Sequence, residues 1–172
     1  MNNYNLSGQY GIGYAFNTNQ AFYFDLEDYD KIKDYTWRED KDGYIVTNIN
    51  GGTRRLHRII MNCPPHFQVD HIYHNTYDNR KEKLRICTNQ QNNMNKDKPL
   101  NNTSGYKGVS WSKSKNKWHS YIRINKRRIH LGYFDDINDA INARQKAEQK
   151  FFGEFRYNVT NKQNNIKEAE NE

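Results

Sequence analysis

Asp70 and His71 are adjacent in the sequence, and this pairing of a carboxylate with an imidazole could perform chemistry. The carboxylate can bind a metal ion while the imidazole accepts a proton from water, both beside one phosphate. Asn92 follows on a predicted helix and can supply a second oxygen ligand. Oxygen ligands in octahedral geometry suit one Mg²⁺ or Mn²⁺ ion. These three residues predict metal-assisted hydrolysis of a phosphodiester, with His71 as the general base.

Several basic side chains near this pair can hold the flanking phosphates. Arg58, Arg80 and Arg85 carry guanidinium groups, which bind phosphate through two parallel hydrogen bonds. His57 is expected to be a structural residue or to contact phosphate rather than to bind metal. The simpler alternative for the Asp70–His71 pair is a structural role, which the surrounding strands, helix and Asn92 make less attractive.

The elements that must position these residues follow the order strand, loop, strand, helix. Apolar patterning predicts strands at residues 68–72 and 84–87, separated by a long polar loop at 74–83. Thr88 can cap a helix that runs to about Asn95, and a short ββα hairpin of this kind can bring Asn92 toward Asp70. Upstream, we predict strands at 10–16, 20–24 and 44–49, helices at 26–35 and 56–61, and a turn at Gly51-Gly52.

The composition indicates a small basic protein of the reducing cell interior. The chain has 172 residues, a net charge of +7, a pI near 9.3 and a mean hydropathy of −1.21. No run approaches the ~18 apolar residues of a membrane span, and the N-terminus lacks a signal pattern. Cys63 and Cys87 form no CxxC pair, which disfavours structural zinc and a disulfide scaffold. We therefore expect a cytoplasmic protein without a membrane partner.

Positive charge is concentrated in one part of the chain. Residues 104–134 contain eight Lys and Arg and no Asp or Glu, whereas residues 1–50 contain four basic and eight acidic residues. Four aromatic residues are interleaved with these charges: Tyr106, Trp111, Trp118 and Tyr121. Such a segment is typical of a surface that faces phosphates, although a solvated face is the simpler alternative. The pattern favours nucleic-acid binding.

A polar stretch at residues 97–104, which contains Pro99, predicts a linker between two domains, 1–96 and 105–157. The second domain is expected to contain strands at 106–111, 118–125 and 128–134 and a helix at 137–152 that ends at Gly153. Residues 158–172 have little apolar surface to bury and predict a flexible tail. The expected fold class is α+β.

Five short motifs lie in the first domain: His57-Arg58, Val69-Asp70-His71, Asp78-Asn79-Arg80, Leu84-Arg85 and Asn92. With them, residues 54–95 resemble the HNH endonucleases of phages and introns, particularly the homing enzymes of the HNN subtype. The resemblance implies a ββα-metal motif at about residues 68–95, metal ligands Asp70 and Asn92, and the general base His71. The family's central asparagine is replaced by Lys83, which cannot accept a hydrogen bond. The resemblance therefore implies weakened cleavage, for which Asn79 could partly compensate.

The second domain carries its own motifs: Tyr106-Lys107-Gly108-Val109, Lys117-Trp118, Ile122-Arg123 and His130-Leu131-Gly132-Tyr133-Phe134. They resemble the plant-type Apetala-two/ERF DNA-binding domain, which implies a three-stranded antiparallel sheet backed by a helix. Its outer face would enter the major groove of double-stranded DNA. The period-two pattern agrees, because Ile122, Ile124, Ile129 and Leu131 alternate with polar residues. The residues predicted to contact DNA are Lys107, Trp111, Arg123, Arg128 and His130.

The sequence thus predicts a phage-encoded, metal-dependent DNA endonuclease that docks through its second domain and needs no obligatory protein partner. The competing prediction is a DNA-binding protein without catalysis that descends from such a nuclease, which Lys83 favours. RNA binding is a further alternative, because a basic sheet can accept structured RNA. Metal-dependent strand scission that is lost in His71→Ala would separate catalysis from binding alone.

Overall fold

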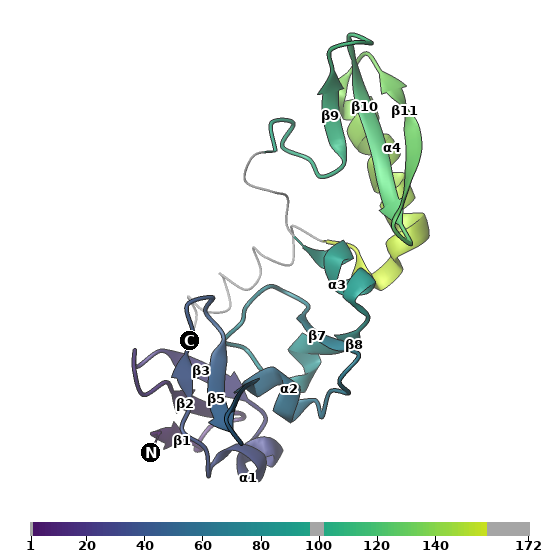
Figure 1. Ribbon diagram of the computed structural model, residues 1–172. Coiled ribbons are helices and arrows are strands. Elements are labelled where there is room, and N and C mark those ends of the chain that lie inside the picture. Colours follow the sequence, from purple (N-terminus) through teal and green to yellow (C-terminus); the bar gives the residue numbers. More distant parts are fainter. Residues whose placement is uncertain (1, 97–101, 158–172) are drawn as a thin grey trace. The chain divides into compact units, whose positions relative to one another are not determined.

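The computed structural model describes residues 2–96 and 102–157. Within these ranges the chain forms two compact units, one ending at Asn89 and the other beginning at Gln90 (Figure 1). The division falls ahead of the predicted linker, so most of the helix that follows Thr88 belongs to the second unit. Residues 97–101 of that linker and the predicted tail lie outside the described residues. Both units combine antiparallel strands with separate helices, which agrees with the α+β class.

The first unit is built from short antiparallel strands in the orders β1-β2-β3, β4-β5-β6 and β7-β8. The strands are β1 (Tyr4–Asn5), β2 (Gly11–Tyr14), β3 (Ala21–Phe24), β4 (Arg38–Glu39), β5 (Ile45–Ile49), β6 (Gly52–Arg55), β7 (Gln68–His71) and β8 (Leu84–Cys87). The helical segments are η1 (Leu26–Asp28), α1 (Tyr29–Ile32), α2 (Leu56–Ile60) and η2 (Lys81–Lys83). The strands predicted in this unit are therefore present, with ends that differ by at most two residues.

The helix predicted at residues 26–35 is wrong in length. A 3₁₀ turn is followed by one helical turn, α1, which ends at Ile32. The indole Nε1 of Trp37 donates to Ile32 O at 3.0 Å, and both residues are fully buried. The chain turns into the core at this point because burial of the indole competes successfully with continuation of the helix. Gly52, predicted as part of a turn, is the first residue of β6.

Aromatic rings form the core of the first unit. Phe24 and Phe22 lie opposite Gly11 and Gly13 across the β2–β3 pair, and both rings are fully buried. A Cβ atom at Gly11 would lie 2.4 Å from the Phe24 ring, and one at Gly13 would lie 2.3 Å from the Phe22 ring. The two glycines thus let the rings lie directly on the neighbouring strand. Any larger residue at these positions would displace a core ring.

The loop between β7 and β8 is fastened to the edge of β3. Tyr23 N donates to Tyr77 O at 2.9 Å, and Asn79 N donates to Tyr23 O at 2.8 Å. Tyr23 and Asp78 thereby form an isolated parallel bridge. These contacts join segments that are far apart in the sequence, so the core sheet determines the path of the loop that leaves His71.

The second unit consists of a three-stranded antiparallel sheet in the order β11-β10-β9, with one long helix packed on it (Figure 1). Its elements are α3 (Asn89–Asn95), β9 (Val109–Ser112), β10 (Lys117–Ile124), β11 (Arg127–Phe134), α4 (Ile137–Phe152) and η3 (Gly153–Phe155). Asp136 caps α4 by accepting a hydrogen bond from Asn138 N at 2.6 Å, and Gly153 follows its last residue with φ of 52°. The predicted bounds of this helix are confirmed. No helix in the described ranges is long and apolar enough to cross a membrane.

Alternation along β10 and β11 separates a face that packs on α4 from an outer face. Ile122 is fully buried with Ala147 and Phe152, whereas Arg123 is exposed, as predicted. Ile129 is 39% exposed, contrary to its predicted inward position, because β11 is an edge strand that α4 covers incompletely. A register shift between Ser120 and Tyr121 interrupts the simple alternation along the β10–β11 pair.

Candidate active site and nucleic-acid interface

Asp70 and His71 end strand β7 and are largely buried, with 5% and 7% of their surface exposed. Across the strand pair, Asp70 lies opposite Arg85 and His71 lies opposite Leu84. Arg85 Nε and Nη2 donate to Asp70 Oδ2 at 2.9 and 2.7 Å. The predicted phosphate ligand Arg85 therefore holds the predicted metal ligand Asp70 in an ion pair.

The imidazole of His71 is surrounded by rings from other elements. Its centroid lies 4.9 Å from that of His57 in an edge-on arrangement and 6.1 Å from that of Tyr44. His57 is only 3% exposed, which favours its structural alternative over contact with phosphate. Tyr44 is not among the predicted site residues, and Arg55 covers its ring at 3.9 Å from the centroid. Two long-range packing contacts thus place His71, and no local sequence pattern signals them.

Burial lowers the pKa of both histidines. The pKa of His71 falls to about 4, because desolvation outweighs the opposing effects of Asn79, Asp70 and Asp78. The pKa of His57 falls to about 2 through burial first and then through the proximity of His71 and two arginines. Both imidazoles are therefore neutral near pH 7, and a neutral His71 is able to accept a proton.

Asn79 connects the loop to His71. Asn79 Oδ1 lies 3.4 Å from His71 Nε2, while Asn79 Nδ2 donates to Tyr77 O at 2.9 Å. The residue is 1% exposed and is tied to β3 through Tyr23. Asn79 therefore contacts both His71 and the edge of β3, which is the arrangement that a loop-supporting residue requires.

Lys83 is the residue that the resemblance to HNH endonucleases aligns with the family's central asparagine. Its ammonium lies 3.4 Å from Glu82 Oε1 and 5.2 Å from the centroid of the Tyr73 ring. Its backbone oxygen accepts a hydrogen bond from Ile72 N at 3.0 Å, which continues the pairing beyond the end of β7. Lys83 thus closes the strand pair through its backbone and pairs its charge with a neighbouring carboxylate.

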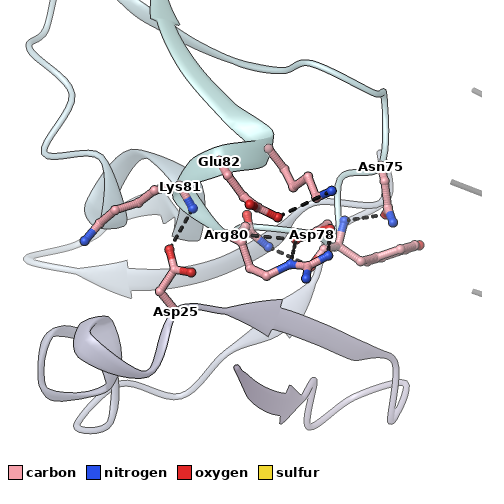
Figure 2. A network of polar contacts seen from close by, with 9 residues as sticks. Asp25, Asn75, Asp78, Arg80, Lys81 and Glu82 are labelled. Atoms are coloured by element: carbon pink, nitrogen blue, oxygen red, sulfur yellow. Dashed lines mark hydrogen bonds and ion pairs between the residues drawn. The ribbon is translucent and has the colours of Figure 1, made fainter. Parts of the chain in front are cut away.

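Two further arginines predicted to bind phosphate also contact the protein itself. Arg80 Nε and Nη2 donate to Asp78 Oδ1 and Oδ2 at 2.9 and 2.7 Å, as Figure 2 shows for the loop beside Asp25 and Lys81. The Arg80 guanidinium also lies 4.6 Å from the centroid of the Tyr10 ring. Arg58 Nη1 and Nη2 donate to the carbonyl oxygens of Phe67 and Pro64 at 2.8 and 3.1 Å. Arg80 and Arg58 therefore order the loops that flank β7.

The donors available for a metal are few but chemically suitable. Asp70 offers a carboxylate, and Asn92 lies in α3, within the second unit. Within residues 2–96 and 102–157, no cluster of three or more His, Cys, Asp or Glu side chains could hold an ion. Mg²⁺ retains several waters and is commonly bound by only one or two carboxylates together with substrate phosphates. A single carboxylate such as that of Asp70 fits that kind of binding.

Two of the predicted DNA contacts in the second unit have defined neighbours. Lys107 Nζ donates to the carbonyl oxygens of Asn93 and Lys96 at 2.8 and 3.1 Å, so its ammonium binds the end of α3. Trp111 is 42% exposed and packs edge-on against Trp118 at 5.2 Å. Lys107 thus has a local structural role, while Trp111 keeps much of its surface open to a ligand.

The remaining predicted contacts lie together on the outer face of β10 and β11. Arg123 lies opposite Arg128, and Tyr121 lies opposite His130. The Arg128 guanidinium lies 4.2 Å from the centroid of the Tyr121 ring. The structure adds the rings of His119 and Tyr133, which were not among the predicted DNA contacts. His119 Nε2 lies 3.0 Å from His130 Nδ1, and the centroid of the Tyr133 ring lies 4.8 Å from that of His130. Strand alternation with Tyr121 could have identified His119, whereas Tyr133 depends on the register shift.

Comparisons with known proteins identify relatives of viral origin. An uncharacterized HNH endonuclease of Acanthamoeba polyphaga mimivirus is 30% identical over an alignment of 142 positions, which covers 76% of this chain and 70% of that protein. Protein 3.8 of Escherichia phage T7 is 36% identical over 59 residues, which are 34% of this chain, and these span 49% of the phage protein. No family model and no solved structure matches the chain. Because the mimivirus protein is 30% identical to this chain and the similarity covers 70% of that protein, this chain belongs to the HNH endonuclease family.

Proposed function

We propose that this protein is a metal-dependent DNA endonuclease of the homing type that hydrolyses phosphodiester bonds. The observation that carries the proposal is the adjacent placement of Asp70 and a neutral His71 at the end of β7, beside the loop that Asn79 anchors. Membership of the HNH family supports the same reaction. The viral relatives support a phage or viral origin. The proposed place of action is the cytoplasm of the host cell.

His71 acts as the general base in this proposal. Because its ring is neutral at pH 7, it can take a proton from the water that attacks the phosphorus. The bond from phosphorus to the 3′ oxygen then breaks, and the leaving oxygen gains a proton from solvent. A divalent ion held by Asp70 and Asn92 would supply positive charge that stabilises the phosphate oxygens and the leaving group.

The second unit would dock the enzyme on double-stranded DNA. Its outer face presents Arg123, Arg128 and His130, and residues 104–134 contain no acidic side chain. A positive surface of this kind supplies affinity for phosphates, and side chains that reach base edges would select the site. The resemblance to the Apetala-two/ERF domain supports the same face of the sheet.

A DNA-binding protein without catalysis is the second candidate, and Lys83 is the observation that favours it. A lysine at the position of the central asparagine cannot accept a hydrogen bond from the catalytic loop. Such a protein would retain the DNA-binding face while lacking strand scission.

Cleavage of supercoiled plasmid and host genomic DNA with Mg²⁺, with Mn²⁺ and with chelator tests the proposal. We expect metal-dependent cutting by the parent, which falls about a hundred- to ten-thousand-fold in His71→Ala. The matched control is His66→Ala, which changes an exposed loop histidine and should keep the parent rate. Cutting by Lys83→Asn alone would mark the parent as a disabled nuclease. Binding of duplex DNA without cutting by either protein would establish the second candidate, and preference for structured RNA in competition would contradict both.

A further inference from the structure

The side-chain amide of Asn79 can adopt only one orientation. Its Nδ2 atom donates to Tyr77 O at 2.9 Å and lies 3.5 Å from Thr76 O, so the nitrogen end must face these two carbonyl oxygens. The reversed amide would place two oxygen acceptors against each other in a buried position. Asn79 Oδ1 is therefore the end that faces His71.

This orientation decides which nitrogen of His71 carries the proton. An amide oxygen accepts hydrogen bonds and cannot donate them, and Asn79 Oδ1 lies 3.4 Å from His71 Nε2. A neutral imidazole must therefore present Nε2–H to Asn79, which makes Nδ1 the acceptor nitrogen. A general base requires a defined acceptor nitrogen directed at the attacking water, so the tautomer matters for the reaction.

The contacts of the loop favour Asn79 over Lys83 as the residue that accepts a hydrogen bond from His71. Asn79 is anchored through its backbone to Tyr23 in β3, so its amide cannot swing away from His71 without disrupting the loop. Lys83 ends in a group that only donates, and its ammonium pairs with Glu82. The family carries an acceptor oxygen at the position of Lys83, and this chain thus carries one at Asn79 instead, four residues earlier.

We propose that Asn79 is the positioning residue for the general base, holding His71 in its Nε2-protonated tautomer in place of the asparagine that Lys83 replaces. The proposal rests on the proposed function only for the role of His71 as the base. The proposal has one direct consequence for activity. His71 keeps its orientation although lysine replaces the family's asparagine at position 83.

Nitrogen-15 NMR of the full chain, labelled at histidine and measured at pH 7.5, tests the tautomer without requiring activity. We expect the parent to show His71 with Nε2 protonated and Nδ1 unprotonated. Asn79→Ala, which removes the acceptor oxygen, should convert His71 to a mixture of tautomers. Asn75→Ala is the matched control, because it removes a hydrogen bond to Tyr77 N in the same loop and should leave the tautomer unchanged. An Nδ1-protonated His71 in the parent, or an unchanged tautomer in folded Asn79→Ala, would overturn the proposal.

Cleavage rates separate this inference from the proposed function. Asn79→Ala should cut about ten- to a hundredfold more slowly than the parent, as is usual when a group that orients an active-site histidine is removed. Lys83→Asn should cut at nearly the parent rate. A large gain in Lys83→Asn with no loss in Asn79→Ala would assign the orienting role to position 83 and overturn the proposal. If the tautomers are as expected but no variant cuts DNA, the positioning contact stands and the nuclease function fails.

Discussion

Arg85 lies directly opposite Asp70 across the β7–β8 pair and donates two hydrogen bonds to Asp70 Oδ2, at 2.9 and 2.7 Å. The contact directs the carboxylate that is proposed to bind metal and partly offsets the cost of burying its charge. A carboxylate has about four acceptor positions, so an arginine and a metal ion can be partners of the same group. We therefore expect Arg85 to orient the Asp70 carboxylate for metal binding rather than to bind a phosphate of the substrate.

Arg85→Ala should destabilise the first unit by about 3 kcal/mol, because it removes one partner of a largely buried ion pair. The two side chains are only 13% and 7% exposed, so water screens the interaction weakly. Urea unfolding at pH 7 measures the change. Lys33→Ala, which breaks the exposed pair with Asp30, serves as the control and should change the unfolding free energy little. Equal losses in the two variants would refute a special role for the Asp70–Arg85 pair.

The buried His57 should make the first unit sensitive to acid. Its pKa in the folded protein is about 2, below the value of 6.5 that the unfolded chain regains, so unfolding takes up a proton between these values. Stability from this residue is present above pH 6.5 and decreases as the pH falls, by up to about 1.4 kcal/mol for each pH unit. His57→Phe should flatten the dependence of the unfolding free energy on pH between 6 and 4. The exposed His66→Phe is the control, and an equally steep dependence in both variants would count against the prediction.

Arg123 should contribute to DNA affinity through phosphate contacts on the outer face of β10. Arg123→Ala should weaken binding of duplex DNA and reduce by about one the slope of log affinity against log salt. Fluorescence anisotropy at several salt concentrations measures both quantities. Lys146→Ala removes an exposed charge from α4 and should leave them nearly unchanged. If Arg123→Ala binds as tightly as the parent at every salt concentration, the docking face is misassigned.

His119 should make DNA binding depend on pH. Burial lowers its pKa, and the proximity of His130 and Arg128 lowers it further, so the ring is neutral at pH 7. Protonation below that pH adds positive charge to a face that also carries Tyr121 and Tyr133. Duplex DNA affinity should therefore rise between pH 7 and pH 5, and the rise should be smaller in His119→Gln. Identical pH profiles for the parent and the variant would show that His119 does not face the DNA.

The sequence by itself was sufficient to predict the elements around the candidate site and the side chains that could perform chemistry there. Local patterns were sufficient for β7, β8 and α4, because strand alternation and helix caps depend on neighbouring residues. The adjacency of Asp70 and His71 likewise needs no tertiary information. The helix predicted at residues 26–35 ends early at Ile32, where the chain turns so that the indole of Trp37 is buried in the core and donates to Ile32 O.

Only the tertiary structure decided the partners of the charged and amide groups. The sequence shows that Arg58, Arg80, Arg85 and Lys107 can bind phosphate, yet each contacts a protein oxygen in the folded chain. Their charge and length are local properties, whereas the oxygens they meet are brought near by folding. The same reason applies to Asn79, whose amide faces His71 because Tyr23 holds the loop against β3.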